Sequence, residues 1–259
     1  MASSVTLFDV KKPVLPFASA GRFLGGIKCR TFFITMSLTA GVLAETTIAP
    51  LPSSVFEYDV DGKKSGIPYS ASATLKWKLN GTQYEAAMAA EMLFVFKRKQ
   101  TSNGFLQEDG IAPRLFRDEG KKGREVRIDA KQKTVLFEGG VTQTLPANTQ
   151  DRVSLFFALP KLINEAKLKG QTQFSVPVIS TTNVAIWTMQ IGAPEPVATK
   201  SGTWTAIPVK RVVGKADTAS TIWYGGDKYQ IPVRILMREP DGTFIDQRLT
   251  KQSRLASSR

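Results

Sequence analysis

The sequence predicts an all-β, mainly antiparallel protein whose strands form a strongly curved meander, an open barrel or half-barrel with one helix packed on it. Three observations predict this class. Apolar and polar residues alternate from Ile67 to Leu79, and this period of two is typical of a strand with one wet face. The alternation returns between Tyr229 and Glu239. Residues 151–169 are the one good helix candidate.

The first 44 residues have the organisation of a secretory signal peptide. Arg22, Lys28 and Arg30 precede an uncharged apolar run, Thr31–Ala44, which ends in Val-Leu-Ala. The run is too short to span a bilayer as a helix. We therefore expect a periplasmic protein, cleaved near Ala44, with no transmembrane span in its mature form. The alternative is that the run is a buried N-terminal strand or helix.

The remaining chain divides into three parts. Residues 45–54 are rich in proline and serine and predict a flexible linker. Residues 55–250 predict a single antiparallel β domain. Residues 251–259 are polar and are expected to fray.

Asn80-Gly81 predicts a tight hairpin, because both residues tolerate the positive φ of a type I′ turn. With these two residues as the loop, the expected pairs are Leu79–Thr82, Trp77–Tyr84, Leu75–Ala86, Ala73–Met88, Tyr69–Met92 and Ile67–Phe94. A slip by one residue would move the apolar set to the other face. The two arms of this hairpin run from Ile67 to Leu79 and from Thr82 to Phe94. Strands of this length must coil, which predicts the strong curvature of the sheet.

A second hairpin is expected at Pro240-Asp241-Gly242, with Met237 opposite Ile245 and Val233 opposite Leu249. Further strand-like runs are Glu125–Asp129, Thr134–Glu138, Thr172–Ser180, Asn183–Ile191 and Trp204–Val213.

The helix candidate has two features that bear on its limits. Asp151 is positioned to cap its start, and Pro160 is expected to kink or split it.

Composition excludes several kinds of site. The chain has no histidine and one cysteine, Cys29, which rules out His-dependent triads, His-ligated metals and multi-cysteine sites. We expect no cofactor and no metal. The formal charge of +13 favours anionic partners, but export makes nucleic acid an unsuitable one.

Two groups of residues are candidate ligand-binding sites. The first is a basic segment that would grip phosphate or carboxylate groups: Arg114, Arg117, Lys121, Lys122 and Arg124. Its alternative is a solvated hairpin whose charges neutralise one another. The second is Trp223 and Tyr224, followed by Gly225-Gly226-Asp227, a turn that would present the rings at a pocket rim. Their alternative is burial in the core.

No catalytic residue can be assigned. Carboxylate pairs can act without histidine, and the candidates are Asp118 or Glu119 with Asp151, Asp227 or Asp246, but spacing singles out no pair. No Ser-x-x-Lys, G-x-S-x-G or P-loop motif occurs.

Three segments resemble a known family: PANTQDRVSLFFAL (146–159), GTWTAIPVKRVV (202–213) and TIWYGGDKYQIPVRILMREPDG (221–242). The family is the DUF3108 type of exported proteobacterial proteins, a domain of unknown function. The resemblance covers residues 55–249, and its best signal is Trp223, Asp227, Pro232, Val233 and Arg234. It implies an envelope location and a curved antiparallel fold, with no activity or catalytic residue to transfer.

These observations favour a non-enzymatic periplasmic envelope protein that shelters an apolar or amphiphilic ligand or docks an envelope partner. Lipid or another anionic or amphiphilic envelope component is the expected partner, and the oligomeric state stays open. The alternatives are a carboxylate-based hydrolase of envelope polysaccharide or peptidoglycan, and a purely structural module. A pocket in the concave face would favour the ligand-sheltering protein, and two facing carboxylates would favour the hydrolase. A fully packed interior would favour the structural module.

Overall fold

The computed structural model describes residues 51–92, 96–120, 123–227 and 230–256. The expected signal peptide therefore lies outside the described residues. No helix within the described part of the chain is long and apolar enough to cross a membrane.

The described residues form a 16-stranded sheet and one α-helix, α1 (Ser154–Leu168), with a short 3-10 helix at Glu138–Gly140. The strands of the first half are β1 (Ser54–Lys64), β2 (Ile67–Asn80), β3 (Gln83–Met92), β4 (Phe96–Gln107), β5 (Gly110–Asp118), β6 (Arg124–Asp129), β7 (Thr134–Leu136) and β8 (Thr142–Thr144). Those of the second half are β9 (Gln150–Asp151), β10 (Gln173–Ile179), β11 (Val184–Ile191), β12 (Glu195–Thr199), β13 (Gly202–Val212), β14 (Ala219–Gly225), β15 (Ile231–Arg238) and β16 (Phe244–Arg254).

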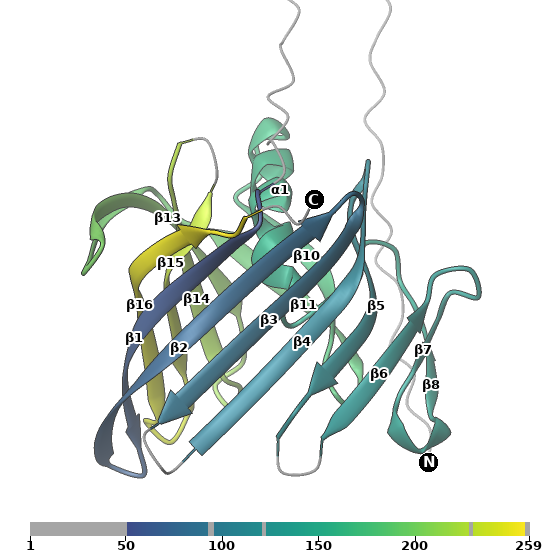
Figure 1. Cartoon of the computed structure of the whole chain (residues 1–259), viewed down its shortest axis with the longest axis horizontal. Helices are drawn as coiled ribbons and strands as arrows, with labels where there is room; N and C mark the ends of the chain where they lie inside the picture. The colour runs from purple at the N-terminus through teal and green to yellow at the C-terminus, as the bar shows by residue number, and fades with distance from the viewer. Residues whose placement is uncertain (1–50, 93–95, 121–122, 228–229, 257–259) are drawn as a thin grey trace, which may run out of the picture. The chain divides into compact units, whose positions relative to one another are not determined.

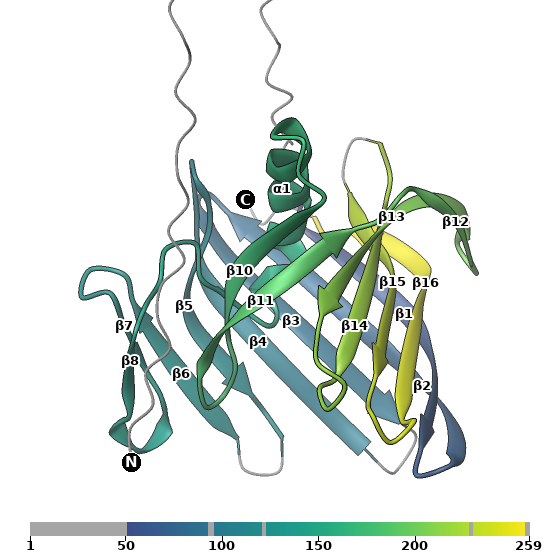
Figure 2. The same cartoon turned by 180° about the vertical axis from the view of Figure 1, so that it is seen from behind.

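The order of the strands explains where the helix lies. From one edge to the other it is β8-β7-β6-β5-β4-β3-β2-β1-β16-β15-β14-β13-β11-β10-β9, with β12 paired to β13 off this path. The chain runs outward from β1 to the edge strand β8, crosses to the opposite edge through β9 and α1, and returns to β16 beside β1. The sheet is curved and unclosed, and α1 stands inside its curve (Figures 1 and 2). The predicted fold class is confirmed.

An apolar row holds α1 against the concave face. Leu155, Leu159, Ile163 and Ala166 recur at intervals of three or four residues, so they lie on one side of the helix. They share one buried cluster with residues from both halves of the sheet, including Phe56, Leu75, Val176, Tyr224 and Val233.

The sequence predicts that Pro160 kinks or splits the helix, and the split does not occur, because α1 is continuous through this residue. Proline has no backbone N–H, so it cannot donate the helical bond to the carbonyl of residue 156. The hydroxyl of Tyr224 donates to the Phe156 carbonyl instead, at 2.8 Å. A strand on the far half of the sheet therefore satisfies the group that the proline leaves unpaired.

The start of α1 is also later than expected, because Asp151 belongs to strand β9. The N-cap position is Val153, which makes no side-chain cap. Asp151 still bonds the first turn, since its Oδ1 accepts the N–H groups of Val153 (2.8 Å) and Ser154 (2.9 Å).

The predicted register of the β2–β3 hairpin is wrong by two residues. Leu79 lies opposite Tyr84, Trp77 opposite Ala86, and Asn80 opposite Gln83. The loop is therefore Gly81-Thr82, with positive φ at Gly81 and not at Thr82, as in a type II′ turn. A two-residue shift keeps every side chain on its face, so alternation cannot distinguish the two registers.

The second hairpin has its predicted register, with Met237 opposite Ile245. The pairing in this ladder ends at Arg234–Arg248, one step before Val233 and Leu249.

Both ends of the domain are more ordered than the sequence suggests. Ser54, expected in the linker, begins β1, and Arg254, expected in the frayed tail, lies opposite it in β16. Trp77 Nε1 donates to the carbonyl of Leu51 (2.9 Å), which anchors the chain ahead of β1.

The Tyr224 bond can be tested with a double-mutant cycle. Tyr224→Phe leaves the buried Phe156 carbonyl without a donor, and we expect it to lower the free energy of unfolding by roughly 1–3 kcal/mol. Pro160→Ala restores a backbone donor, so Tyr224→Phe should cost less in that background. Urea unfolding of the four proteins measures the coupling. If Tyr224→Phe lowers the free energy of unfolding equally with Pro160 and with alanine at this position, Tyr224 does not replace the donor that the proline lacks.

Candidate functional site

A pocket of about 820 Å³ lies beside α1, between the helix, the β4–β5 turn and the segment that precedes β9. Its walls are mainly apolar and include Leu106, Ile111, Pro113, Leu145, Phe157 and Leu162. Its polar residues include Gln107, Glu108, Lys133, Asn148 and Glu165. Since the packed row of α1 faces the core cluster, the residues between its members supply the helical wall.

The β4–β5 turn is tied to α1 at the pocket. Lys161 Nζ donates to the carbonyl of Asp109 (2.7 Å) and pairs with Glu165, one helical turn on, at 2.7 Å. Gly110 follows with a φ of 136°, a conformation that favours glycine. These contacts fix the distance between the helix and the tip of the hairpin.

An aromatic group forms part of the pocket wall. Trp77 stacks on Tyr84 with ring centroids 5.0 Å apart and contacts Phe157 at 4.6 Å. Trp77 and Phe157 both line the pocket, and Trp77 is almost fully buried. This part of the wall is therefore apolar.

A buried acid, Asp151, lies at the start of α1. Asp151 is fully buried, and its Oδ2 accepts a hydrogen bond from Ser102 Oγ at 2.5 Å, while Tyr84 Oη lies 2.8 Å from the same hydroxyl. Burial raises the pKa of Asp151 to about 6, although the bonds from Ser102, Ser154 and Val153 oppose the rise. This network joins the helix start to β3 and β4.

The other candidate carboxylates have partners of their own. Asp118 is held by Arg98 (2.5 Å) and by Gln100 (2.8 Å). Asp246 is held by Arg234 at 2.7 Å and by a second arginine. Burial raises the pKa of each carboxyl, but the hydrogen bonds and charges of these partners outweigh it and lower the pKa overall. Such carboxylates stay ionised and serve as structural anchors.

Two further carboxylates complete this set. Glu119 pairs with Lys99 at 2.9 Å, and Asp227 is exposed. No group of three or more Asp, Glu or Cys side chains in the described ranges is arranged to hold a metal ion.

The predicted basic segment forms the β5–β6 hairpin and does not line the pocket. Arg117 and Arg127 both bond Glu125 at 2.7 Å, and Arg124 lies 3.9 Å from Glu138. Arg114 lies over the ring of Phe105. Two of these arginines share one carboxylate, so whether the segment binds an anion stays a prediction. Lys121 and Lys122 lie outside the described residues.

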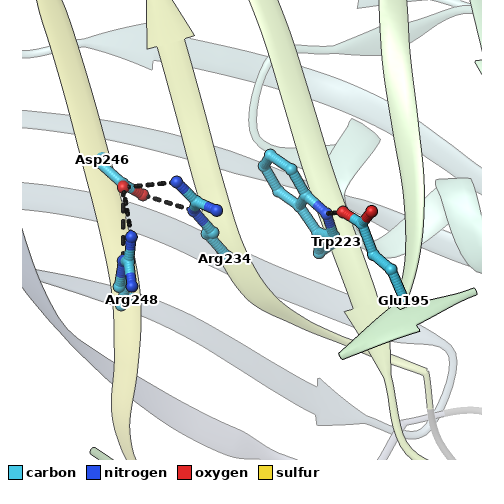
Figure 3. A network of polar contacts seen from close by, with 5 residues as sticks. All are labelled: Glu195, Trp223, Arg234, Asp246 and Arg248. Carbon is cyan, nitrogen blue, oxygen red and sulfur yellow. Dashed lines mark hydrogen bonds and ion pairs between the residues drawn. The ribbon is translucent and has the colours of Figure 1, made fainter. Parts of the chain in front are cut away.

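Trp223, Tyr224 and Asp227 do not gather at one site. Trp223 Nε1 donates to Glu195 at 2.5 Å, and the Arg234 guanidinium lies 4.6 Å from its ring centroid (Figure 3). Tyr224 reaches the helix, and Asp227 is exposed past the end of β14.

The network in Figure 3 explains the strongest part of the sequence resemblance. Trp223 and Arg234 are directly opposite each other on β14 and β15, and Arg234 continues to Asp246 and Arg248 on β16. Arg234 alternates with the buried Val233 and Ile235, so this network lies on the outer face of the sheet. Its role is to join neighbouring strands.

Sequence reasoning missed the pocket. Its lining comes from seven segments between Leu51 and Pro232, and none of them carries a motif that marks a ligand site. The usable signal was Asp109-Gly110, a tight-turn pair that marks the tip of the β4–β5 hairpin.

Comparison with known proteins identifies a matching family model and a solved structure with a similar fold. A family model for a protein of unknown function (DUF3108) matches residues 57–250. The β-barrel-like protein of the domain of unknown function DUF1849 from Brucella abortus has a TM-score of 0.53 and 13% sequence identity, covering 80% of this chain and 99% of that chain. A putative outer membrane lipoprotein-sorting protein domain from Vibrio parahaemolyticus has a TM-score of 0.35 and 10% identity, covering 80% and 87%. No curated protein matches the sequence.

The buried acid predicts a pH dependence. A carboxyl with a raised pKa in the folded chain binds its proton more tightly there, so its contribution to stability is present at low pH and is lost as the pH rises through about 6. Asp151→Asn cannot ionise. Between pH 4.5 and 7.5 the free energy of unfolding of this variant should therefore gain roughly 1–3 kcal/mol relative to wild type. Urea unfolding at the two pH values measures the gain.

Glu85→Gln, an exposed change on β3, is the matched control for this measurement and should show no such gain. The assignment is wrong if Asp151→Asn and wild type differ by the same amount at both pH values.

Proposed function

The chain belongs to the DUF3108 family of proteins of unknown function, and we propose that it is a non-enzymatic envelope protein that shelters the apolar part of a ligand in the pocket beside α1. One observation carries the proposal: the pocket has about 820 Å³ of space and mainly apolar walls. Pockets that hold small molecules have this size and this composition.

The distribution of polar groups supports an amphiphilic ligand. Lys161 joins Asp109 and Glu165 in one polar group at the pocket, while the rings of Trp77 and Phe157 contact each other in its lining. An apolar chain would pack against the rings, and a polar group would remain near Lys161 and its partners. Each buried methylene would contribute about 0.8 kcal/mol to binding.

The carboxylate-based hydrolase is not favoured by the candidate carboxylates. Asp151 has the raised pKa of a general acid, but it is fully buried and bonded to Ser102. Asp118 and Asp246 are both bound by arginine, which suits a structural anchor better than a general acid.

Binding can be measured with a neutral fluorescent fatty-acyl ester and by native mass spectrometry of protein before and after solvent extraction. Ala112→Trp fills space at the pocket wall and should weaken probe binding at least tenfold. Ala198→Trp makes the same change at an exposed position on β12 and should bind like wild type. Absence of both probe binding and co-purified lipid in wild type would refute the proposal.

We further propose export to the periplasm, which rests on the charged and apolar order of residues 22–44. N-terminal sequencing of protein isolated from the producing cell should begin at Glu45 or within a few residues of it. An intact Met1 in a cytosolic fraction would contradict export.

A further inference from the structure

Three arginines from separate segments face the concave side of the sheet near the start of α1. Arg98 on β4 is four residues before Ser102, which is buried and bonded to Asp151. Arg211 on β13 is two residues after Val209, a fully buried member of the cluster that contains the apolar row of α1. Since strand side chains alternate, both arginines share the inner face with these neighbours.

The third arginine, Arg152, lies in the turn between β9 and α1. Its backbone position is fixed because the preceding residue, Asp151, is bonded to Ser102 and to the first turn of the helix. Asp151 pairs with Ile179 on β10 and is bonded to Ser102 on β4, so the turn that carries Arg152 lies between these two parts of the sheet. The charges of Arg98, Asp118 and Arg211 all act on Arg152 there.

The other two arginines are held in place by different contacts. Arg98 forms two bonds to Asp118, at 2.5 and 3.2 Å. Arg211 lies over the ring of Trp187 at 4.1 Å and donates to the carbonyl of Thr218 at 3.4 Å. Arg152 has neither a hydrogen bond nor an ion pair with any residue in the described part of the chain.

Arg152 has no ion-pair partner among the described residues. Asp118 bonds Arg98, and the charge of Asp217 acts on Arg211. Arg152 is exposed, so its guanidinium, which stays protonated, is open to a ligand from solvent. Partial desolvation and the charges of Arg98 and Arg211 lower its pKa, against the opposing charge of Asp118.

Apolar side chains surround the cluster. In the β3–β4 ladder Ala90 lies opposite Arg98 and Met88 opposite Gln100, so these side chains share one face. Ala90, Met88 and Trp187 are only partly buried, and each packs against the main core.

We propose that Arg98, Arg152 and Arg211 bind an oxyanion on the concave face, the phosphate or carboxylate group of an amphiphile. The planar guanidinium forms paired hydrogen bonds to such groups, and an anion would balance the unpartnered Arg152. The apolar neighbours favour an amphiphile over a free ion, because they would bury its chain beside the head group. The described residues of this cluster do not line the pocket beside α1, so the proposal stands apart from the function proposed above.

The test compares two ligands with the same acyl chain, oleoyl lysophosphatidic acid and monooleoylglycerol, by isothermal titration below their aggregation concentrations. Wild type should bind the phosphate-bearing ligand at least tenfold more tightly, and the preference should shrink as salt rises. Arg152→Gln should abolish the preference without weakening monooleoylglycerol binding. Arg114→Gln, an equal charge change on the exposed side of β5, should keep the preference.

A second measurement on unliganded protein keeps the proposal testable if a variant binds poorly for structural reasons. Arg152→Gln should melt at or above the temperature of wild type, because the exposed side chain that it replaces makes no hydrogen bond or ion pair with the described residues. A lower melting temperature would mean that Arg152 supports the fold and would overturn its assignment to a site.

The remaining outcomes separate the ligand sources. If inorganic phosphate binds with the same dependence on Arg152 and the lipid binds no more tightly, the site takes the free ion. Equal binding of the two oleoyl ligands by wild type, with no binding of inorganic phosphate, overturns the proposal. Ala112→Trp should bind oleoyl lysophosphatidic acid like wild type, because the arginine cluster lies apart from the pocket, and loss of this binding would overturn the separate site.

Discussion

The packing of α1 against the concave face of an unclosed sheet is the interaction on which the rest of this structure depends. A curved sheet whose edges do not meet leaves an apolar face that must be covered. The chain meets this need by topology, because it crosses from one edge to the other between β8 and β10 and forms the helix during that crossing. Leu159 and Ile163 are completely buried by this arrangement.

Hydrogen bonds then fix the position of the helix on the sheet. Asp151 joins its start to β4 through Ser102, Lys161 joins its middle to the β4–β5 turn, and Tyr224 joins it to β14. Because these bonds reach both halves of the sheet, they also hold the halves together across the open side. Gln143 on β8 adds a direct link, since its side chain accepts the N–H of Val184 on β11 at 2.9 Å.

The two candidate sites follow from this placement. Apolar residues of α1 beside its packed row form a wall of the pocket. The turn before the helix carries Arg152, on which the charges of Arg98 on β4 and Arg211 on β13 both act. The motif that most resembles the family has a different role, because Trp223 and Arg234 join strands on the outer face. The residues that resemble the family most therefore support the sheet, and the two candidate sites are formed by other residues.

The sequence by itself determined the fold class, the helix and the second hairpin, because alternation and tight-turn residues act between near neighbours in the chain. It left the β2–β3 register open by two residues, since such a shift keeps Trp77 and Leu75 on the same face. The continuity of α1 through Pro160 was decided by Tyr224, which is distant in sequence. The pocket and the arginine cluster were likewise decided only by tertiary structure, because each joins segments that meet only once the sheet has curved and the helix has crossed it.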